Sequence, residues 1–433
     1  MYELSIGIDI GTTSICGISA DCDSGKILES LTLVNDSFIK TDKPYERIQD
    51  CSKIIDKVLM IADKLCNGET VSIGLSNQMH GILYADKNAN PLSPLYIWQD
   101  SRGALKYNET STYAEYLGSY PGYGLVTDFY NRVNSLVPDG TAYCMSIGEL
   151  AALKLCEKTS PIMHITNAAA FGCFDLNKNE FTVSLPYLPA VTDSFAVVGK
   201  YKGIPVTVSF GDNQASFAGS VRDNTSALIN VGTGSQISVL CDSPDVGKLL
   251  EARPFDGKKF LAAGCALCGG RAFAMAERFI ASCVELATGN KPDSLYRQID
   301  ALLETKTQTT MKADARFCGT RNDPTVTGAY FNIDENNFTP GDMLLSTLNA
   351  MAGELYEMYA SLNQKSSSLV CSGNGIRKNA ALKKIAGEVF SQQVKVPLYK
   401  EEAAYGAALS SMAGTGVYKS LDEARTLIKY EGE

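Results

Sequence analysis

The sequence predicts an α/β protein built from two related domains, and three observations lead to that prediction. Strand-like and helix-like stretches alternate along the whole chain, as they do in α/β proteins. The length of 433 residues exceeds what a single hydrophobic core usually organises. A motif also occurs twice, as IGIDIGTTS at residues 6–14 and as ALINVGTGS at residues 227–235. A duplicated domain explains the repeat, and we place the two domains at residues 1–222 and 223–433.

Periodic apolar residues locate the main elements around the two motifs. Helical spacing predicts helices over residues 46–66 and 271–286, and a third that starts at Thr339-Pro340. Asn67-Gly68 ends the first of these helices, and the apolar stretch 71–75 predicts a short strand after it. Near the C-terminus we expect a helix over residues 378–391, followed by the strand VKVP.

Composition and charge argue against several classes of protein. Lys and Arg number 39, and Asp and Glu number 48, which gives a formal net charge of −9. A chain of this kind is not expected to bind nucleic acid or an anionic membrane. The start of the chain lacks the pattern of a signal peptide, and no apolar run approaches the ~20 residues that span a bilayer. The 13 cysteines are expected to be reduced and mostly buried, so we expect a cytoplasmic protein.

Each copy of the repeated motif reads as a β-hairpin whose turn suits phosphate. A strand carrying Asp9 or Asn230 ends in a tight turn of Gly, Thr and Ser, and a second strand follows. Glycine lets a ligand approach the backbone, and the N–H groups and hydroxyls of such a turn can donate to phosphate. Asp9 adds a carboxylate that suits Mg²⁺, directly or through water. One turn alone would more simply be a hairpin connection, but two copies favour a pair of phosphate sites.

The hairpins resemble those of the actin, Hsp70 and sugar-kinase ATPase superfamily, and five further motifs resemble its FGGY carbohydrate kinase branch. SNQMHG at residues 76–81 is similar to the sugar-reading loop of that family, and WQDSR at 98–102 to its Trp-Gln/Asn-Asp-x-Arg element. GDNQA at 211–215 resembles the segment with the catalytic aspartate, and SGNG at 372–375 the adenosine loop. EAAYGAA at 402–408 resembles the small-residue helix near the family's C-terminus.

The resemblance implies a fold, a reaction and a set of cofactors. The fold would consist of two duplicated ribonuclease-H-like domains, as in actin-like ATPases, with a cleft between them. The first domain would bind a small-molecule sugar and the second the nucleotide. The protein, a monomer or homodimer, would use ATP and Mg²⁺ and would transfer the γ-phosphate to a terminal hydroxyl of a ketose.

Sedoheptulose is the ketose that the resemblance favours, because WQDSR, NVGTGSQ and CSGNGIRKNAALKK look closest to sedoheptulokinases. Xylulose, another ketose and a polyol remain open. Gln-Met-His-Gly differs from the loop of glycerol kinases, which resembles Gln-Arg-Glu. An alternative from another class is an actin-like or chaperone-like ATPase without a sugar substrate. It would share both Gly-Thr hairpins but would need neither the Gln-Met-His-Gly loop nor the Asp212 motif.

Asp212 is the candidate catalytic base, because transfer to a sugar hydroxyl needs a carboxylate that orients the alcohol and accepts its proton. From local sequence alone, an N-cap aspartate of the following helix is an equal alternative. Asp9 and Asp212 are the candidate metal carboxylates. The other candidates follow the matched motifs: for the sugar, Gln78, Met79, His80, Asp100, Arg102, Asp212 and Asn213; for ATP, Gly11, Thr12, Thr13, Gly232, Thr233, Gly234, Gly373, Asn374, Gly375 and Asn379.

Several residues with chemical side chains are expected to be structural. Trp98 reads as part of a buried strand, and His164 has no motif around it. Cys265 and Cys268 form a single Cys-x-x-Cys without a second pair, so a zinc site is not expected. Arg102 is expected to orient Asp100 or its loop. Residues 146–149 replace a stretch in which many relatives carry an aspartate, and we assign no ligand there.

Overall fold

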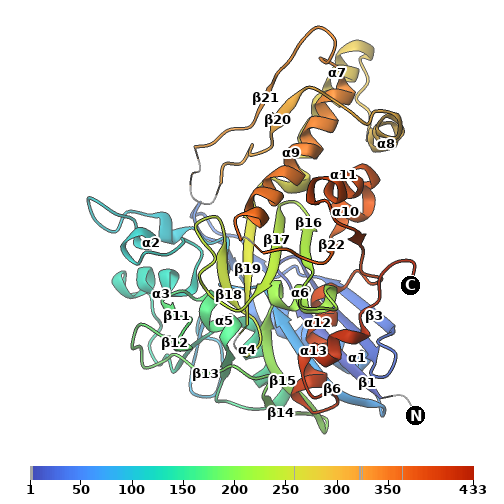
Figure 1. Ribbon diagram of the computed structural model, residues 1–433. Helices are drawn as coiled ribbons and strands as arrows, with labels where there is room; N and C mark the ends of the chain where they lie inside the picture. The colour runs from blue at the N-terminus through green and yellow to red at the C-terminus, as the bar shows by residue number, and fades with distance from the viewer. Residues whose placement is uncertain (1–2, 258, 321–322, 324, 363) are drawn as a thin grey trace. The chain divides into compact units, whose positions relative to one another are not determined.

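The computed structural model describes residues 3–257, 259–320, 323, 325–362 and 364–433, and the chain forms two compact units (Figure 1). The first unit comprises residues 1–223, 253–260 and 401–429, and the second comprises residues 224–252, 261–400 and 430–433. This division differs from the expected domains 1–222 and 223–433, because two segments from the second half of the chain belong to the first unit. The longer segment contains helix α12 (Glu402–Gly414).

A six-stranded mixed sheet organises the first unit, in the order β14-β15-β6-β1-β2-β3. The first three strands form an antiparallel meander, whereas β6 runs parallel to β1 and to β15. The strands are β1 (Leu4–Ile10), β2 (Ser14–Asp21), β3 (Ile27–Val34), β6 (Thr70–Asn77), β14 (Val197–Tyr201) and β15 (Ile204–Gly211).

Alternation along β1 separates the two faces of this sheet. The isoleucines of β1 point into the hydrophobic core, which they share with α1 (Cys51–Leu65) and α4 (Ile147–Cys156). Ser5, Gly7 and Asp9 therefore point to the opposite face. On that face, Ser5 Oγ donates to the carbonyl oxygen of Ala408 in α12 at 3.1 Å. The side of the sheet that carries Asp9 is thus the side that α12 covers.

Glycines let α12 approach the sheet and helix α6 (Asp212–Ser220) at backbone distance. A methyl group at Gly7 would lie 1.8 Å from the carbonyl oxygen of Ala404. At Gly406 of α12 a methyl group would lie 1.9 Å from the carbonyl oxygen of Ala215 in α6. These contacts explain why α12 belongs to the first unit, since they leave no room for larger side chains on either surface.

Shorter elements surround this sheet in the first unit. Short strands pair with one another: β4 (Phe38–Ile39), β5 (Ile48–Gln49) and β8 (Leu95–Tyr96); β7 (Leu83–Ala85) and β9 (Tyr143–Met145); β10 (Ile162–His164) and β13 (Ala190–Thr192); β11 (Phe174–Asp175) and β12 (Glu180–Phe181). Further helices are α2 (Tyr113–Tyr116), α3 (Gly124–Val133), α5 (Ile165–Ala170) and α13 (Leu421–Ala424), with 3-10 turns at Arg102–Ala104 and Arg425–Leu427.

A second six-stranded sheet, in the order β18-β19-β17-β16-β22-β23, organises the second unit. β16 pairs antiparallel with β17 and parallel with β22, which repeats the pairing of β1 with β2 and β6. The strands are β16 (Ala227–Val231), β17 (Ser235–Cys241), β18 (Glu251–Pro254), β19 (Phe260–Ala266), β22 (Leu369–Ser372) and β23 (Val394–Lys395).

Five helices and a small hairpin complete the described part of the second unit. Two long helices, α7 and α9, contact one another (Figure 1), and their apolar faces share one core with the sheet. The elements are α7 (Gly269–Thr288), α8 (Tyr296–Thr305), α9 (Pro340–Ala360), α10 (Asn374–Lys378), α11 (Ala380–Phe390), β20 (Lys312–Asp314) and β21 (Ala329–Phe331).

The expected helices are present, but their ends differ from the sequence prediction. α1 begins later than residue 46, because the Asp50 side chain accepts from the N–H groups of Ser52 and Lys53 as an N-cap. Thr339 caps α9, as predicted. The helix expected over residues 378–391 begins at residue 380 as α11, capped by Asn379, with the short α10 before it. Among the helices in the described ranges, none has the length and apolar character needed to span a bilayer.

Candidate active site

Asp9 lies near the carboxyl end of β1, and its partner comes from the neighbouring parallel strand. It stands opposite Ser76 of β6 in the strand register, and Ser76 Oγ donates to Asp9 Oδ1 at 2.6 Å. Burial raises the pKa of the Asp9 carboxyl, and the hydrogen bond from Ser76 offsets part of that effect. Ligands of α/β proteins usually bind beyond this end of parallel strands, so Asp9 is well placed to meet one.

The second unit repeats this arrangement with an amide in place of the carboxylate. Asn230 of β16 stands opposite Ser372 of β22, and Asn230 Nδ2 donates to Ser372 Oγ at 2.8 Å. The two hairpins therefore agree in strand pairing and in side-chain register. They differ in charge, because only the position in the first unit carries a carboxylate.

Asp212 lies where β15 meets α6, next to the end of β6. Gly211 is the N-cap and Asp212 is the first helical residue, so Asp212 is not the capping residue that local sequence allowed. The pKa of Asp212 is raised to about 7, first by burial and then by the charge of Asp9, while Arg253 opposes the shift. Arg253 Nη1 also donates to Asn213 Oδ1 at 3.0 Å, which holds the residue next to Asp212.

The carboxylates of Asp9 and Asp212 fit a hard divalent cation. The charge of Asp9 raises the pKa of Asp212, and a bound cation would relieve that repulsion. Within the described residues, no cluster of three or more His, Cys, Asp or Glu side chains is arranged to hold a metal. Mg²⁺ commonly uses one or two carboxylates and completes its shell with water and phosphate oxygens, which matches this pair.

Both hairpin turns are closed by the N–H group of their first glycine, which donates to a carbonyl three residues later in the first turn and two residues later in the second. The Gly11 N–H donates to the carbonyl oxygen of Ser14 at 3.0 Å, and the Gly232 N–H donates to that of Gly234 at 2.9 Å. These two donors are therefore not available to a phosphate. Four other N–H groups in the turns donate to no atom in the described part of the chain: those of Thr12, Thr13, Thr233 and Gly234.

The Thr12 side chain ties the first hairpin to the Gln-Met-His-Gly loop. Its hydroxyl donates to Gln78 Oε1 at 2.9 Å and accepts from Trp98 Nε1 at 3.0 Å. Gln78 Nε2 in turn donates to Gln49 Oε1 at 2.9 Å. The Thr12 hydroxyl is thus occupied within the protein, so a phosphate would meet the Thr12 N–H rather than its side chain.

Trp98 is 47% exposed, which contradicts its expected place in a buried strand. The strand β8 ends at Tyr96. The indole ring of Trp98 lies at the surface, where its Nε1 donates to the Thr12 hydroxyl. An exposed aromatic ring beside polar groups offers a stacking surface to a sugar. The WQDSR motif could have indicated that Trp98 belongs to a binding loop. The apolar residues before Trp98 instead suggested that it lies in a buried strand.

His80 is held in one orientation at the end of the Gln-Met-His-Gly loop. Its backbone has a positive φ of 72°, its ring stacks on Tyr123 with centroids 4.3 Å apart, and its Nδ1 lies 2.7 Å from the carbonyl oxygen of Ala170. Because a carbonyl only accepts, Nδ1 carries a proton. Met79 is buried and packs toward Gly211, where a methyl group would lie 3.0 Å from Met79 Sδ.

Asp100 and Arg102 form a buried ion pair, each 1% exposed. Arg102 Nε and Nη2 donate to the two oxygens of Asp100 at 2.7 and 3.0 Å. The N–H groups of Arg102 and Arg47 donate to the same oxygens at 3.1 and 3.0 Å. A carboxylate has about four acceptor positions, and all are filled here. This geometry differs from the expected sugar-reading role of Asp100, since the pair instead fixes the loop that follows Trp98.

Two features left outside the predicted site are structural. His164 is fully buried and caps α5, and burial lowers its pKa to about 3. Glu149, 2% exposed, forms a capping box with Ser146 at the start of α4. Residues 146–149 are therefore explained by the start of a helix.

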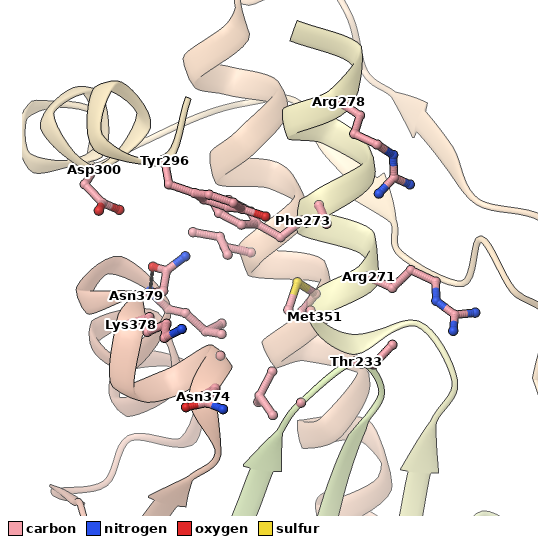
Figure 2. Close-up of a pocket in the computed structure, with 17 residues that line it drawn as sticks. Thr233, Arg271, Phe273, Arg278, Tyr296, Asp300, Met351, Asn374, Lys378 and Asn379 are labelled. Atoms are coloured by element: carbon pink, nitrogen blue, oxygen red, sulfur yellow. Dashed lines mark hydrogen bonds between the residues drawn. The ribbon is translucent and has the colours of Figure 1, made fainter. Parts of the chain in front are cut away.

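A pocket of about 810 Å³ lies beside the second hairpin, within the second unit (Figure 2). Five residues that the sequence predicted for nucleotide binding line it: Gly232, Thr233, Asn374, Gly375 and Asn379. Gly373, just before them, has a positive φ of 84°, and a methyl group there would lie 2.6 Å from the carbonyl oxygen of Val231. Glycine at this position therefore allows the loop to pass close to the hairpin.

Most of the side chains that line this pocket were not predicted from the sequence. Phe273 and Tyr296, with ring centroids 6.2 Å apart, form an apolar wall together with Met351. Figure 2 shows these rings reaching into the pocket from α7 and α8. Four charged residues also line it, three basic and one acidic: Arg271, Arg278, Lys378 and Asp300. Of these residues only Lys378 lies within a matched motif, CSGNGIRKNAALKK, and the helical spacing of the apolar ones is also that of core residues.

Two family models together match most of the chain. The N-terminal domain of the FGGY family of carbohydrate kinases matches residues 4–137, and its C-terminal domain matches residues 227–414. The chain belongs to the FGGY family of carbohydrate kinases. This match confirms the resemblance seen in the motifs. It also sets aside the actin-like or chaperone-like ATPase, which would not need the sugar-loop motifs.

Members of this family align with nearly the whole chain. The sedoheptulokinase of Mus musculus is 24% identical over 467 residues, covering 94% of this chain and 96% of the mouse protein. A xylulose kinase of Staphylococcus epidermidis is 22% identical, with 97% and 90% of the two chains covered. The crystal structure of ligand-bound xylulose kinase from Lactobacillus acidophilus has a TM-score of 0.85 at 17% identity, with 99% and 93% covered. The predicted α/β fold with two duplicated domains is confirmed.

Proposed function

We propose that this protein is an ATP-dependent ketose kinase that phosphorylates a terminal hydroxyl of its sugar. Membership of a carbohydrate kinase family supports the reaction class. The observation that carries the proposal is the position of Asp212 at the junction of β15 and α6, in the same unit as Asp9, where burial raises the pKa of its carboxyl to about 7. A base whose pKa is close to the working pH is effective at accepting a proton from an alcohol.

The pocket of the second unit is the proposed ATP site. Its apolar wall of Phe273, Tyr296 and Met351 suits the adenine ring. The free N–H groups of the hairpin turn are the proposed phosphate donors there, and the basic residues Arg271 and Lys378 add positive charge. Backbone donors and a few local cations allow a chain of net charge −9 to bind a polyphosphate.

The first unit is the proposed sugar site. Gln78, His80 and Asn213 are the proposed polar contacts of the sugar, and Trp98 is the proposed stacking surface. Asp212 would accept the proton of the terminal hydroxyl as that oxygen bonds to the γ-phosphorus and the bond between the γ-phosphorus and the β,γ-bridging oxygen breaks.

Asp9 is the second carboxylate of the proposed reaction centre. Together with Asp212 it would hold Mg²⁺, which offsets the negative charge of the β- and γ-phosphates when bound. The Ser76 hydroxyl fixes one oxygen of Asp9, so the carboxylate is oriented before the cation arrives.

Sedoheptulose is the proposed substrate, and D-xylulose is the second candidate. The motifs WQDSR and NVGTGSQ favour the seven-carbon sugar, and a sedoheptulokinase and a xylulose kinase are both relatives of the whole chain. We expect ADP production to depend on added sugar, with the highest kcat/KM for sedoheptulose in a panel of ketoses and polyols. Sugar-independent ADP production at the same rate would contradict the kinase proposal, and a higher kcat/KM for D-xylulose would move the assignment to the second candidate.

The variant Asp212→Asn tests the proposed base. We expect it to bind ADP in metal-free buffer with wild-type affinity and to lose about 10³-fold in kcat, because a general base contributes about 10²–10⁴-fold. The matched control is Asp56→Asn, which makes the same change on the exposed face of α1. Wild-type turnover in Asp212→Asn would remove Asp212 from the base role.

A further inference from the structure

Two cysteines form a thiol pair at the start of α7, beside the pocket of the second unit. Cys268 is the residue that precedes α7, and Cys318 comes from a segment 50 residues later. Their sulfur atoms lie 3.4 Å apart. The Cys-x-x-Cys pattern suggested Cys265 as the neighbour of Cys268, but Cys265 belongs to β19. The pair is therefore made by the tertiary fold.

Arg271 joins this pair from the first turn of α7. Its Nη1 donates to Cys318 Sγ at 3.4 Å. Burial alone would raise the pKa of Cys318, but its side-chain contacts with Arg271 and Cys268 and the positive charge of Arg271 outweigh burial, so that the pKa is lowered. A thiolate beside a cation, partly open to solvent, is the reactive form of cysteine.

Cys268 has the opposite character. It is 2% exposed, and its pKa is raised to about 12, first by burial and then by Cys318. Burial and the neighbouring sulfur therefore keep Cys268 in its thiol form, whereas Cys318 ionises more readily than an ordinary cysteine. An attacking thiolate with a second sulfur in contact is the arrangement that converts a sulfenic acid into a disulfide.

We propose that Cys318 and Cys268 form a hydroperoxide-reactive dithiol site, in which Cys318 attacks the peroxide and Cys268 resolves the product. The co-reactant is a hydroperoxide such as hydrogen peroxide. The site is independent of the proposed kinase reaction and uses none of its groups except Arg271.

The reaction balances in two steps. The Cys318 thiolate attacks one oxygen of hydrogen peroxide, so that an S–O bond forms, the O–O bond breaks and hydroxide leaves. The Cys268 thiol gives its proton to that hydroxide, and its sulfur attacks the sulfenic sulfur of Cys318. The S–S bond forms as the S–O bond breaks, and the second oxygen leaves as water after taking up a proton. The two thiols lose two electrons and two protons, and the peroxide becomes two waters.

Oxidation would also change the pocket through Arg271. This residue lines the pocket, and in Figure 2 its guanidinium points away from Phe273 and Tyr296. When Cys318 is ionised it is the anionic partner of Arg271, whereas a disulfide sulfur carries no charge. Arg271 would then be released toward an anionic ligand. The release of Arg271 toward a ligand rests on the proposed function of the pocket. The oxidation of Cys318 and Cys268 to a disulfide does not.

Peroxide treatment followed by peptide mapping tests the site. One equivalent of hydrogen peroxide is expected to link Cys268 to Cys318 and to remove two titratable thiols per chain. In Cys268→Ser, a sulfenic-acid trap such as dimedone should label Cys318. Cys265→Ser is the matched control and should still form the linkage. Modification of the exposed Cys283 while Cys268 and Cys318 stay reduced would overturn the proposal.

Two arginine variants test the activating contact. Arg271→Met is expected to slow peroxide consumption by Cys318 about tenfold, because the thiolate loses its cation. Arg278→Met removes the same charge two helical turns along α7 and should leave the rate near wild type. Equal slowing in both variants would show that the overall positive charge near α7, and not the contact of Arg271 with Cys318, sets the rate. An unchanged rate in Arg271→Met would show that this arginine does not activate Cys318.

MgADP affinity, measured by calorimetry on reduced and oxidised protein, tests the link to the pocket. We expect the oxidised form to bind about fivefold tighter, as a freed arginine adds a charge-assisted contact to phosphate. Cys318→Ser should show no change on peroxide treatment. Equal affinity in both forms would overturn the link through Arg271. Failure of both forms to bind MgADP would contradict the proposed nucleotide site, while the mapped disulfide would still decide the thiol proposal.

Discussion

The buried carboxyl of Asp212, close enough to Asp9 to feel its charge, lowers the stability of the folded protein when it is ionised. Its pKa is raised from 3.8 to about 7, by burial first and by Asp9 second. A group whose pKa is raised by folding favours the folded state while it is protonated. Its contribution is fully present below pH 3.8 and is lost as the pH rises to about 7, above which the cost is constant. The carboxylate needed for proton transfer therefore destabilises the protein in which it lies.

This cost predicts the stability of Asp212→Asn in metal-free buffer with a chelator. The variant should unfold at nearly the same urea concentration as wild type near pH 4. It should become more stable than wild type as the pH rises, by up to about 4 kcal/mol above pH 7. Urea titrations at five pH values check this, with Asp56→Asn as the control. An advantage that is equal at pH 4 and pH 8 would show that ionisation of Asp212 is not its source.

Individual residues also show how far a motif can be interpreted. WQDSR located the loop that carries Trp98, Asp100 and Arg102, but the side chains take roles that the letters do not specify. Trp98 is exposed and Asp100 is buried, the reverse of the expectation from hydropathy and charge. The reason is the ion pair with Arg102, which satisfies Asp100 inside the protein. The ion pair itself lies within the motif, but the Arg47 N–H that also donates to Asp100 comes from outside it, so the burial of Asp100 cannot be seen in the motif.

Helix α12 is the element whose place the sequence predicted least well. Its small residues were recognised, but its position near the C-terminus suggested that it belongs to the second domain. The glycines that receive it lie far away in the sequence, at Gly7, Gly74 and Gly219. In contrast, the hairpins were predictable, because their strands, turn and pairing partner are adjacent in sequence. Local elements follow from local patterns, whereas docking depends on surfaces assembled by the fold.

Close backbone contact makes α12 sensitive to a single methyl group. In Gly406→Ala the methyl group would lie 1.9 Å from the carbonyl oxygen of Ala215, and neither backbone can yield. We expect a loss of at least about 3 kcal/mol in the free energy of unfolding. Gly353→Ala is the matched control within helix α9, since no atom in the described part of the chain lies within 4 Å of its added methyl group. It should stabilise the protein by about 1 kcal/mol, and denaturant unfolding of both variants compares the two. An unchanged free energy of unfolding in Gly406→Ala would show that α12 can move away from α6 without loss of stability.

For the whole molecule, the net charge was a poor guide to local charge. A chain of −9 has a pocket lined by Arg271, Arg278 and Lys378 against a single acidic residue, Asp300. A negative net charge does not exclude a phosphate ligand, since backbone N–H groups need no side-chain charge. The basic residues of the pocket could not be predicted from composition, because they are spread over separate helices and are outnumbered elsewhere.

The division of the chain into units predicts how fragments behave. The chain passes from one unit to the other after residues 223, 252, 260, 400 and 429. A fragment of residues 1–222 therefore lacks α12 and leaves Gly7, Gly74 and the adjoining face of the sheet uncovered. It also lacks Phe255, which is fully buried and packs on Phe217 with ring centroids 5.5 Å apart. We expect this fragment to show no cooperative unfolding transition.

Restoring α12 provides the matching experiment. Residues 1–223, 253–260 and 401–429, joined by flexible linkers, should regain a cooperative transition and near-ultraviolet circular dichroism. The last segment supplies the helix that covers the Asp9 face of the sheet, and its linker brings it close at high effective concentration. The same fusion carrying Gly406→Ala should fail, because the restored helix could not dock. Cooperative unfolding of residues 1–222 alone would show instead that the first unit folds before α12 is added, and that α12 only stabilises a domain already formed.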